Sequence, residues 1–328
     1  MVRDISVTHP VGVAFDAVRT ILFTPFDLGK WFIIGFGAFL AQLGSGGFGG
    51  PNFNYNVGSP PGPGSPTGDL SELIDWISQH IVVISAIALA VVTVGVTLTL
   101  LFLWLSSRGQ FMLLDNVIHN RAKVAEPWRR FKLLAGSLFR LRLGLLALTT
   151  LISLLVIAAG LALAWSDIQH KTFTVRGVLA LIGGVGLLSL IMLTFALCQH
   201  VLVDFVVPIM FRRNLTCMAG VRIFRHEILR GHVWTLTLFY LMRALLMIAA
   251  GIAAFVVTLL TCCLAALPYL GSVILLPITL FFRSYSLLYL EQFSPEWKML
   301  YPDIPHEHDP FAPQPPAPHP PPAGPYPG

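Results

Sequence analysis

Charged side chains are scarce in this sequence. Asp, Glu, Lys and Arg make up 11% of its 328 residues, whereas hydrophobic residues make up 55%. A water-soluble globule has about a quarter of its residues charged, so this chain has too little polar surface to coat one. Its mean hydropathy of +0.75 therefore places it in a lipid bilayer.

Residues that carry common chemistries are also missing. The sequence contains no phosphate-binding loop, no His-Glu-x-x-His motif and no nucleophile elbow. Its four cysteines, Cys198, Cys217, Cys262 and Cys263, lack zinc-ligand spacing, and adjacent cysteines rarely form a relaxed disulfide. We interpret them as small buried side chains, and we expect no enzyme activity, no cofactor and no metal site.

The net charge of +5 does not indicate nucleic acid, because the basic residues lie in loops between apolar runs. The first ten residues also lack the apolar core of a cleavable signal peptide, so the first hydrophobic helix is expected to remain as a span. A membrane helix needs about 20 apolar residues. The sequence predicts an all-α bundle of six transmembrane helices at about 28–45, 81–105, 141–165, 177–203, 240–264 and 272–290.

Two segments are too rich in Gly and Pro to pack. The segment 44–69 contains no Lys or Arg and is predicted to be a flexible extracytoplasmic loop. After a membrane domain at 1–293, the tail at 294–328 is predicted to be disordered, with polyproline II character that would suit a protein partner.

The runs 110–115 (QFMLLD) and 199–204 (QHVLVD) each close an apolar segment with a carboxylate and precede a basic amphipathic stretch. Together with Glu291 after the sixth segment, they predict three repeated hairpins. Each hairpin comprises a cytoplasmic amphipathic helix at the membrane interface, an outgoing span and a span returning to an acid. The apolar stripes of the amphipathic helices are Val11, Phe15, Val18 and Leu22; Trp128, Phe131, Leu134 and Leu138; and Met218, Val221, Phe224 and Ile228.

The distribution of basic residues predicts the orientation. Three lie before the first span, eight between 108 and 142, five between 212 and 230, and one in the tail, against two in the intervening loops. Because basic loops stay in the cytoplasm, both termini are predicted to be cytoplasmic, in a multi-pass protein of the inner membrane.

Charged side chains at the span ends are expensive near hydrocarbon unless they are paired or wet. We therefore predict that they meet in one cytoplasmic-side cluster, which would be either a proton or substrate site or a set of anchors that fixes the packing of the hairpins. Arg243 is ten residues into an apolar segment: it lies about 15 Å deep if the span begins near Val233, and is an anchor if the span begins at Ala244. The predicted cluster contains Asp115, Asp204, Glu291, Arg108, Arg142, Arg243, Arg283, Gln110 and Gln199.

Three motifs, 25–31 (PFDLGKW), 204–208 (DFVVP) and 283–291 (RSYSLLYLE), resemble an uncharacterised family of six-span prokaryotic membrane proteins. That family is similar in outline to the membrane domain attached to some glycerophosphoryl diester phosphodiesterases. The resemblance covers about residues 10–297 and implies topology. It does not imply hydrolysis, because no soluble segment is long enough for a catalytic barrel of about 250 residues.

The sequence thus favours a non-enzymatic membrane protein that acts through assembly, lipid contact or a partner of the tail. The alternative is a transporter or channel with its pathway between the hairpins, where Gly183, Gly184 and Gly251 would interrupt the helices. Glycines at helix contacts explain the same pattern. A membrane-embedded enzyme would need acids or histidines deeper than any that the pattern places. Substrate and oligomeric state are not specified by the sequence.

Overall fold

The computed structural model describes residues 6–24, 26–44, 80–170, 175–261, 264 and 267–300. Every regular element in these ranges is a helix, as predicted. Most of the predicted loop at 44–69 and of the predicted tail lies outside the described residues. The α-helices are α1 (His9–Phe23), α2 (Leu28–Leu43), α4 (Ile81–Ile118), α5 (Ala125–Arg130), α6 (Lys132–His170), α7 (Val175–Val201), α8 (Val207–Arg213), α9 (Cys217–Ile223), α10 (Val233–Leu260), α11 (Pro268–Ile274) and α12 (Leu276–Glu291). Two π-helical turns, η1 (Leu202–Val206) and η2 (Phe224–Leu229), and the 3₁₀ turn η4 (Pro295–Trp297) complete the chain.

Four helical stretches in the described ranges are long and apolar enough to cross a membrane, which marks the chain as a membrane protein. They are Ile81–Ile118, Lys132–Trp165, Gly177–Arg213 and Val233–Leu260. Long helices suit these sequences because a backbone in hydrocarbon satisfies its hydrogen bonds only within a helix or a closed barrel. They contain the predicted spans 81–105, 141–165 and 177–203, and most of 240–264.

The other two predicted spans are shorter or interrupted. α2 has 16 residues, about 24 Å of helix, against a hydrocarbon core of about 30 Å. The segment 272–290 is divided at Leu275, where α11 ends and Pro277 enters the first turn of α12. The structure therefore shows four candidate spans, while six spans in three repeated hairpins remain a prediction.

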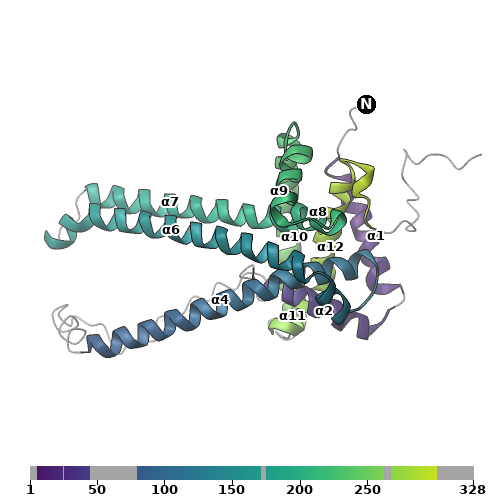
Figure 1. Cartoon of the computed structure of the whole chain (residues 1–328), viewed down its shortest axis with the longest axis horizontal. Helices are drawn as coiled ribbons and strands as arrows, with labels where there is room; N and C mark the ends of the chain where they lie inside the picture. The colour runs from purple at the N-terminus through teal and green to yellow at the C-terminus, as the bar shows by residue number, and fades with distance from the viewer. Residues whose placement is uncertain are drawn as a thin grey trace, which may run out of the picture.

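Long apolar helices project from a packed core. In Figure 1, α4, α6 and α7 leave the core in one direction, with α6 and α7 side by side as the second predicted hairpin requires. None of the 18 most apolar consecutive residues of α4, or of α7, is buried. Such a large exposed apolar surface is what a bilayer would cover.

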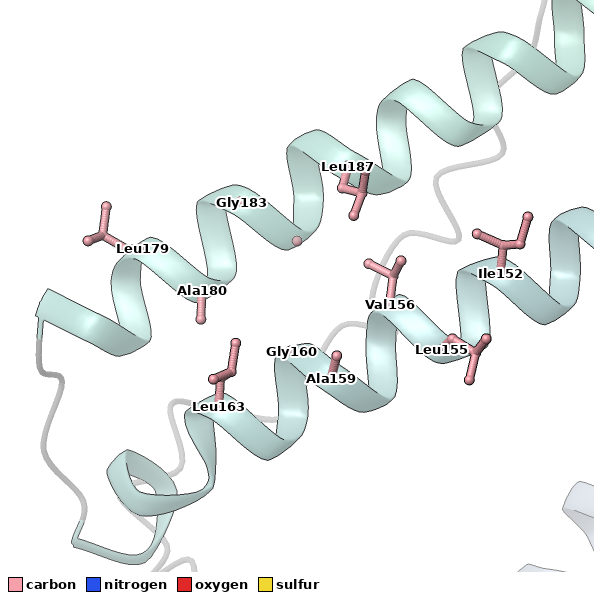
Figure 2. Close-up of a pocket in the computed structure, with 11 residues that line it drawn as sticks. Ile152, Leu155, Val156, Ala159, Gly160, Leu163, Leu179, Ala180, Gly183 and Leu187 are labelled. Carbon is pink, nitrogen blue, oxygen red and sulfur yellow. The ribbon is translucent and has the colours of Figure 1, made fainter.

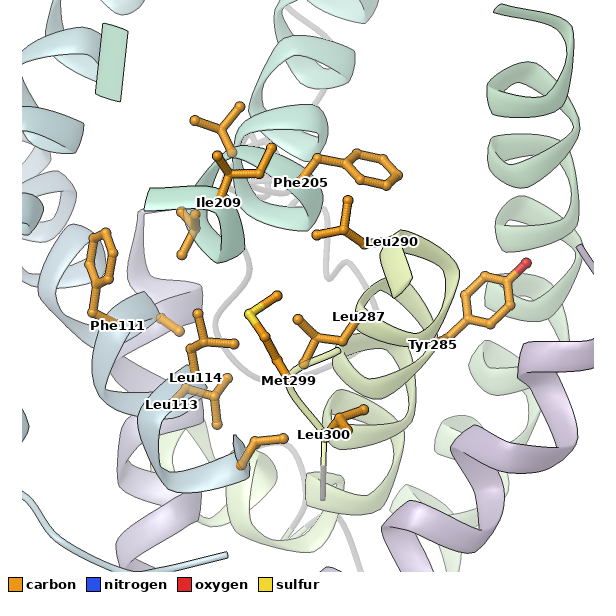
Figure 3. Close-up of a cluster of buried hydrophobic side chains, with 14 of the residues drawn as sticks. Phe111, Leu113, Leu114, Phe205, Ile209, Tyr285, Leu287, Leu290, Met299 and Leu300 are labelled. Carbon is orange, nitrogen blue, oxygen red and sulfur yellow. The ribbon is translucent and has the colours of Figure 1, made fainter. Parts of the chain in front are cut away.

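The core forms where these helices meet the short ones. Figure 3 shows Met299 between Leu114 on α4 and Leu287 on α12, with Phe205 nearby. Phe239 of α10 stacks on Tyr289 of α12, with ring centroids 4.3 Å apart. These aromatic contacts join α10 to α12 and to the end of α7.

The helix α1 buries part of its predicted stripe. Val18 and Leu22 are buried together with Ala14, but Phe15 is 68% exposed. The small residues at positions 14 and 17 let α1 approach α12, and Tyr285 donates a hydrogen bond to the Val7 carbonyl (3.1 Å). This face of α1 therefore contacts protein, whereas its amphipathic pattern predicts contact with the membrane surface.

The second and third amphipathic stretches agree with the prediction in part. Phe131 and Leu138 are buried, yet α6 runs unbroken from Lys132 into the span, so the expected interfacial helix and third span are one element. In the third stretch Phe224 is buried whereas Met218 is 66% exposed.

The contacts of α2 set its position along α4. Near the start of α2, Lys30 donates to Asn120. At the other end, Gly44 lies against Ser106. The two helices are thus antiparallel, and α2 covers α4 from about Leu103 to the end of α4 at Ile118. It lies beside the core end of α4 rather than along the predicted partner span at 81–105.

Candidate functional site

Four of the nine side chains of the predicted charge cluster come together where the apolar helices enter the core. We call Arg142, Asp204, Arg243 and Arg283 the arginine cluster. They come from α6, η1, α10 and α12. All four are buried or nearly so.

Asp204 and Arg243 form an ion pair. The Asp204 Oδ1 atom lies 3.0 Å from Arg243 Nη1, and the side chains are 3% and 11% exposed. This contact is within ion-pair distance but lacks hydrogen-bond geometry. Asp204 Oδ2 and Arg243 Nε have no hydrogen-bond partner in the described part of the chain. The pair therefore leaves polar atoms unsatisfied in a buried place.

Arg283 is held by the backbone of the neighbouring π-helical turn. Its Nη1 atom donates to the Val203 carbonyl at 2.6 Å. In a π-helical turn the backbone hydrogen bonds run from i+5 to i, and Pro208, five residues after Val203, has no N–H to donate to this carbonyl. Arg283 is 5% exposed, lies within electrostatic range of the other three cluster members, and its Nε and Nη2 atoms find no partner among the described residues.

Arg142 joins the cluster to α4 and α2. Its Nη1 atom donates to Ser106 Oγ (3.3 Å), and Ser106 Oγ donates in turn to the Ala41 carbonyl (2.7 Å). Gln110 Nε2 donates to the same carbonyl at 3.0 Å. Gln110 is thereby connected to Arg142. Gln199 lies near the end of α7, and its buried Nε2 atom has no hydrogen-bond partner in the described ranges.

Asp115 lies elsewhere. It is fully buried and accepts three hydrogen bonds from Arg121 at 2.8–3.2 Å, with His119 Nδ1 at 3.3 Å. Asn120 has a left-handed backbone (φ 47°) that turns the chain after α4, so Arg121 comes back to Asp115. Arg121 is one of the eight basic residues between 108 and 142, and the Asn that turns the chain is the sequence signal for its pairing with Asp115.

Two further predicted members have local partners. Glu291 lies 4.0 Å from Lys298 Nζ. Arg108 sits over the rings of Trp104 and Trp128, 4.5 and 4.9 Å from their centroids, in cation–π geometry. Both contacts involve residues that are near in sequence or on the adjoining helix.

Arg243 lies within the apolar helix α10. Leu236, Phe239 and Ala254 are buried on one face of the helix, whereas Leu241 and Leu245 are more than 60% exposed on another. The whole of α10, Val233–Leu260, is long and apolar enough to cross a membrane. The depth of Arg243 in that span therefore stays a prediction.

Beside the cluster, the thiol of Cys217 on α9 is inert. The side chain is 1% exposed, and burial raises its pKa to about 12, against a smaller opposing effect of the Arg142 charge. A thiol with this pKa is protonated at neutral pH and is a poor nucleophile. Among the described residues, no three His, Cys, Asp or Glu side chains gather as metal ligands.

A groove of about 460 Å³ runs between the outer parts of α6 and α7. In Figure 2, Ala180 and Leu163 point toward each other across it. All of its lining residues are aliphatic or glycine, so it offers an apolar surface and no chemistry. A smaller groove beside Trp104 and Arg108 is lined by α4 and α6 residues outside the arginine cluster.

Four long apolar helices around a core with a buried arginine cluster define a helical membrane protein. Residues 6–276 match the model of a family of unknown function, DUF7544, and the chain belongs to that family. Comparisons with curated proteins and with solved structures returned no match. The family supports the predicted resemblance to an uncharacterised group, while the likeness to the phosphodiesterase membrane domain stays a prediction.

Proposed function

We propose that this chain is a non-enzymatic integral membrane protein whose apolar helices contact lipid and whose core is a scaffold at one face of the bilayer. The observation that carries the proposal is the contrast along α4. Its residues from Ile81 to Leu101 are mostly exposed and apolar, whereas Phe111 to Val117 are buried among protein side chains. The outer part suits lipid and the inner part suits assembly.

The packing of the interior favours a scaffold over a transport pathway. Phe205, which follows Asp204 in the sequence, is fully buried and meets the rings of Phe239 and Tyr289 edge to face. Those two rings are also fully buried and stack on each other. The grooves beside α6 are lined by other residues. A transport route would need a wet cavity along Asp204, Arg243 or Gln199.

We propose further that the core faces the cytoplasm, with both termini on that side of the inner membrane and six spans in total. The support is the positive-inside pattern and the position of the basic segments 121–132 and 212–230, which follow the core ends of α4 and α7. In the six-span arrangement α2 and the α11–α12 segment also cross the membrane. The tail's protein partner belongs to the same proposal.

Fluorescence quenching tests the lipid contact. The full chain is reconstituted in bilayers of brominated lipid, using variants that keep only Trp165, which is 55% exposed on α6, or only Trp297, which is 1% exposed in the core. We expect the bromines to quench Trp165 strongly and Trp297 little. Equal quenching of the two would contradict a lipid-facing α6 attached to a dry core.

The second candidate is a transporter or channel, favoured by the unsatisfied polar atoms of Gln199, Asp204 and Arg243. Proteoliposomes holding the wild-type chain or the Asp204→Asn variant are compared for chloride, phosphate and proton flux. The scaffold proposal predicts background flux in both. Wild-type flux that the folded variant loses would instead establish the pathway.

A further inference from the structure

We infer that the arginine cluster is a binding site for a phosphate group, carried either by a lipid headgroup or by free phosphate. The inference rests on geometry and charge, and depends on the proposed membrane insertion only for the lipid as the source. The arginine cluster has more positive charge and more hydrogen-bond donors than its single carboxylate satisfies.

The charge of the cluster is unbalanced. Three guanidinium groups and the Asp204 carboxylate together leave an excess of two positive charges. Arg142 and Arg283 are 3% and 5% exposed, so water screens them poorly. Buried charges are costly unless they are paired. A bound anion would therefore stabilise this buried cluster more than it would stabilise an exposed group of arginines.

The unused donors have the right chemistry. Arg142 Nε, Arg243 Nε, and Arg283 Nε and Nη2 are buried and have no hydrogen-bond acceptor among the described residues. Guanidinium groups offer a planar fork of donors that matches the oxygens of a phosphate. The hydroxyl groups of Tyr240 and Tyr289, also buried and unsatisfied in this region, add neutral donors.

The cluster also lies at a suitable depth. Arg142 precedes the exposed apolar length of α6, its partner Ser106 follows that of α4, and Asp204 follows that of α7. These points mark the plane where apolar helix gives way to packed core. Basic sites between helices at this level of a membrane protein are suited to acidic headgroups.

The test uses the full chain, delipidated in a phosphate-free sugar detergent. Its unfolding midpoint is measured against inorganic phosphate and against chloride at equal ionic strength, and separately against dihexanoyl phosphatidylglycerol and octyl glucoside. We expect a saturable rise of the midpoint with a phosphate-bearing probe. A rise with inorganic phosphate identifies a site open to free phosphate, and a rise with the lipid alone identifies a headgroup site.

Variants assign the effect to the cluster. Arg142→Gln and Arg283→Gln are expected to weaken binding at least tenfold, and Arg283→Lys is expected to weaken it less. Arg140→Gln is the matched control, because Arg140 is exposed two residues away on the same helix. Its binding should equal that of the wild type.

Asp204→Asn separates binding from folding. It removes the carboxylate that competes for the arginines, so phosphate should bind several-fold tighter even if the ligand-free protein is less stable. The inference is overturned if phosphate and lipid give no more stabilisation than chloride and octyl glucoside. It is equally overturned if Arg140→Gln loses as much binding as Arg142→Gln, or if Asp204→Asn binds more weakly. Should the Gln variants fail to fold, the wild-type and Asp204→Asn measurements decide.

Discussion

At the scale of single residues, each buried charge of this protein has a different degree of compensation. Asp115 is fully paired through Arg121, whereas Asp204 shares its environment with three arginines. The sequence predicted that acids at span ends would find bases, because unpaired charge near hydrocarbon is unfavourable. The identity of the partner could not be predicted, because it depends on the backbone turn at Asn120 for one acid and on the meeting of four helices for the other.

Asp115→Asn should destabilise the fold. The amide keeps the shape but loses the charge that Arg121 pairs with, so we expect the free energy of unfolding to fall by about 2 kcal/mol. Equilibrium unfolding in SDS mixed micelles measures the change. Glu126→Gln is the control, since its pairs with Arg121 and Lys123 are largely exposed, and it should behave as the wild type. If the free energy of unfolding fell as much in Glu126→Gln, the burial of Asp115 would not explain the destabilisation.

At the scale of elements, hydropathy located the long helices well and the short ones poorly. The apolar length of α4 predicts a span whatever its neighbours are, because its environment is lipid. The placement of α2 depends instead on a glycine in α4, which has no side chain to keep the two helices apart. Gly109 lets the α2 backbone approach so closely that an added Cβ would lie 2.5 Å from the Ala41 nitrogen. A periodicity argument does not detect that fit.

Gly109→Ala should therefore separate α2 from α4. The clash is with backbone atoms, which cannot move aside as a flexible side chain would, and we expect about 1–3 kcal/mol of destabilisation. Gly95→Ala on the same helix has nothing within 4 Å of its added Cβ and should be neutral or slightly stabilising. Unfolding in SDS mixed micelles compares the two variants. If both are neutral, α2 does not pack on α4 at this point.

The C-terminal turn η4 should be sensitive to acid. A hydrogen bond from Arg213 holds the pKa of Glu296 below its ordinary value of 4.5. A carboxylate whose pKa is lowered in the folded state stabilises that state above its unfolded pKa, and the contribution is lost as pH falls through the folded pKa. Below about pH 4.5, Trp297, whose ring lies 4.8 Å from the Arg213 guanidinium carbon, should become more accessible to a soluble quencher. In Glu296→Gln this exposure should already be present at neutral pH; a variant with the wild-type pH profile would contradict the role of this bond.

At the scale of the whole molecule, the class could be predicted from composition alone, but the architecture only in part. Charge scarcity and the apolar runs indicated a helical membrane protein before any contact was known. The predicted repeat treated 28–45 and 272–290 as full spans, yet Pro277 divides the second and α2 is shorter than a bilayer. Whether such segments cross depends on their helical neighbours and on the membrane itself, which no short stretch of sequence encodes.

Cysteine labelling in intact cells tests the proposed orientation. In a background with the native cysteines replaced by serine, an impermeant thiol reagent should modify Val175→Cys and leave Arg129→Cys and Glu296→Cys unmodified. Glu296 should behave like Arg129 because it contacts Arg213 at the end of α8. Permeabilised cells provide the control, in which all three should react. Labelling of Arg129→Cys before permeabilisation would show the opposite orientation to the one proposed.

The continuity of α4 has a mechanical consequence. The helix passes without a break from its exposed outer length into the core, where its last 13 residues extend for about 20 Å. A tilt of about 20°, which bilayers of different thickness commonly impose on a helix, would swing the inner end by about 7 Å if it were free to move. Because that end is held by α2 and the Asp115 turn, a tilt imposed by a thinner membrane would be transmitted to the core as strain. The contact between Ser106 and Arg142 would be the point about which the helix turns.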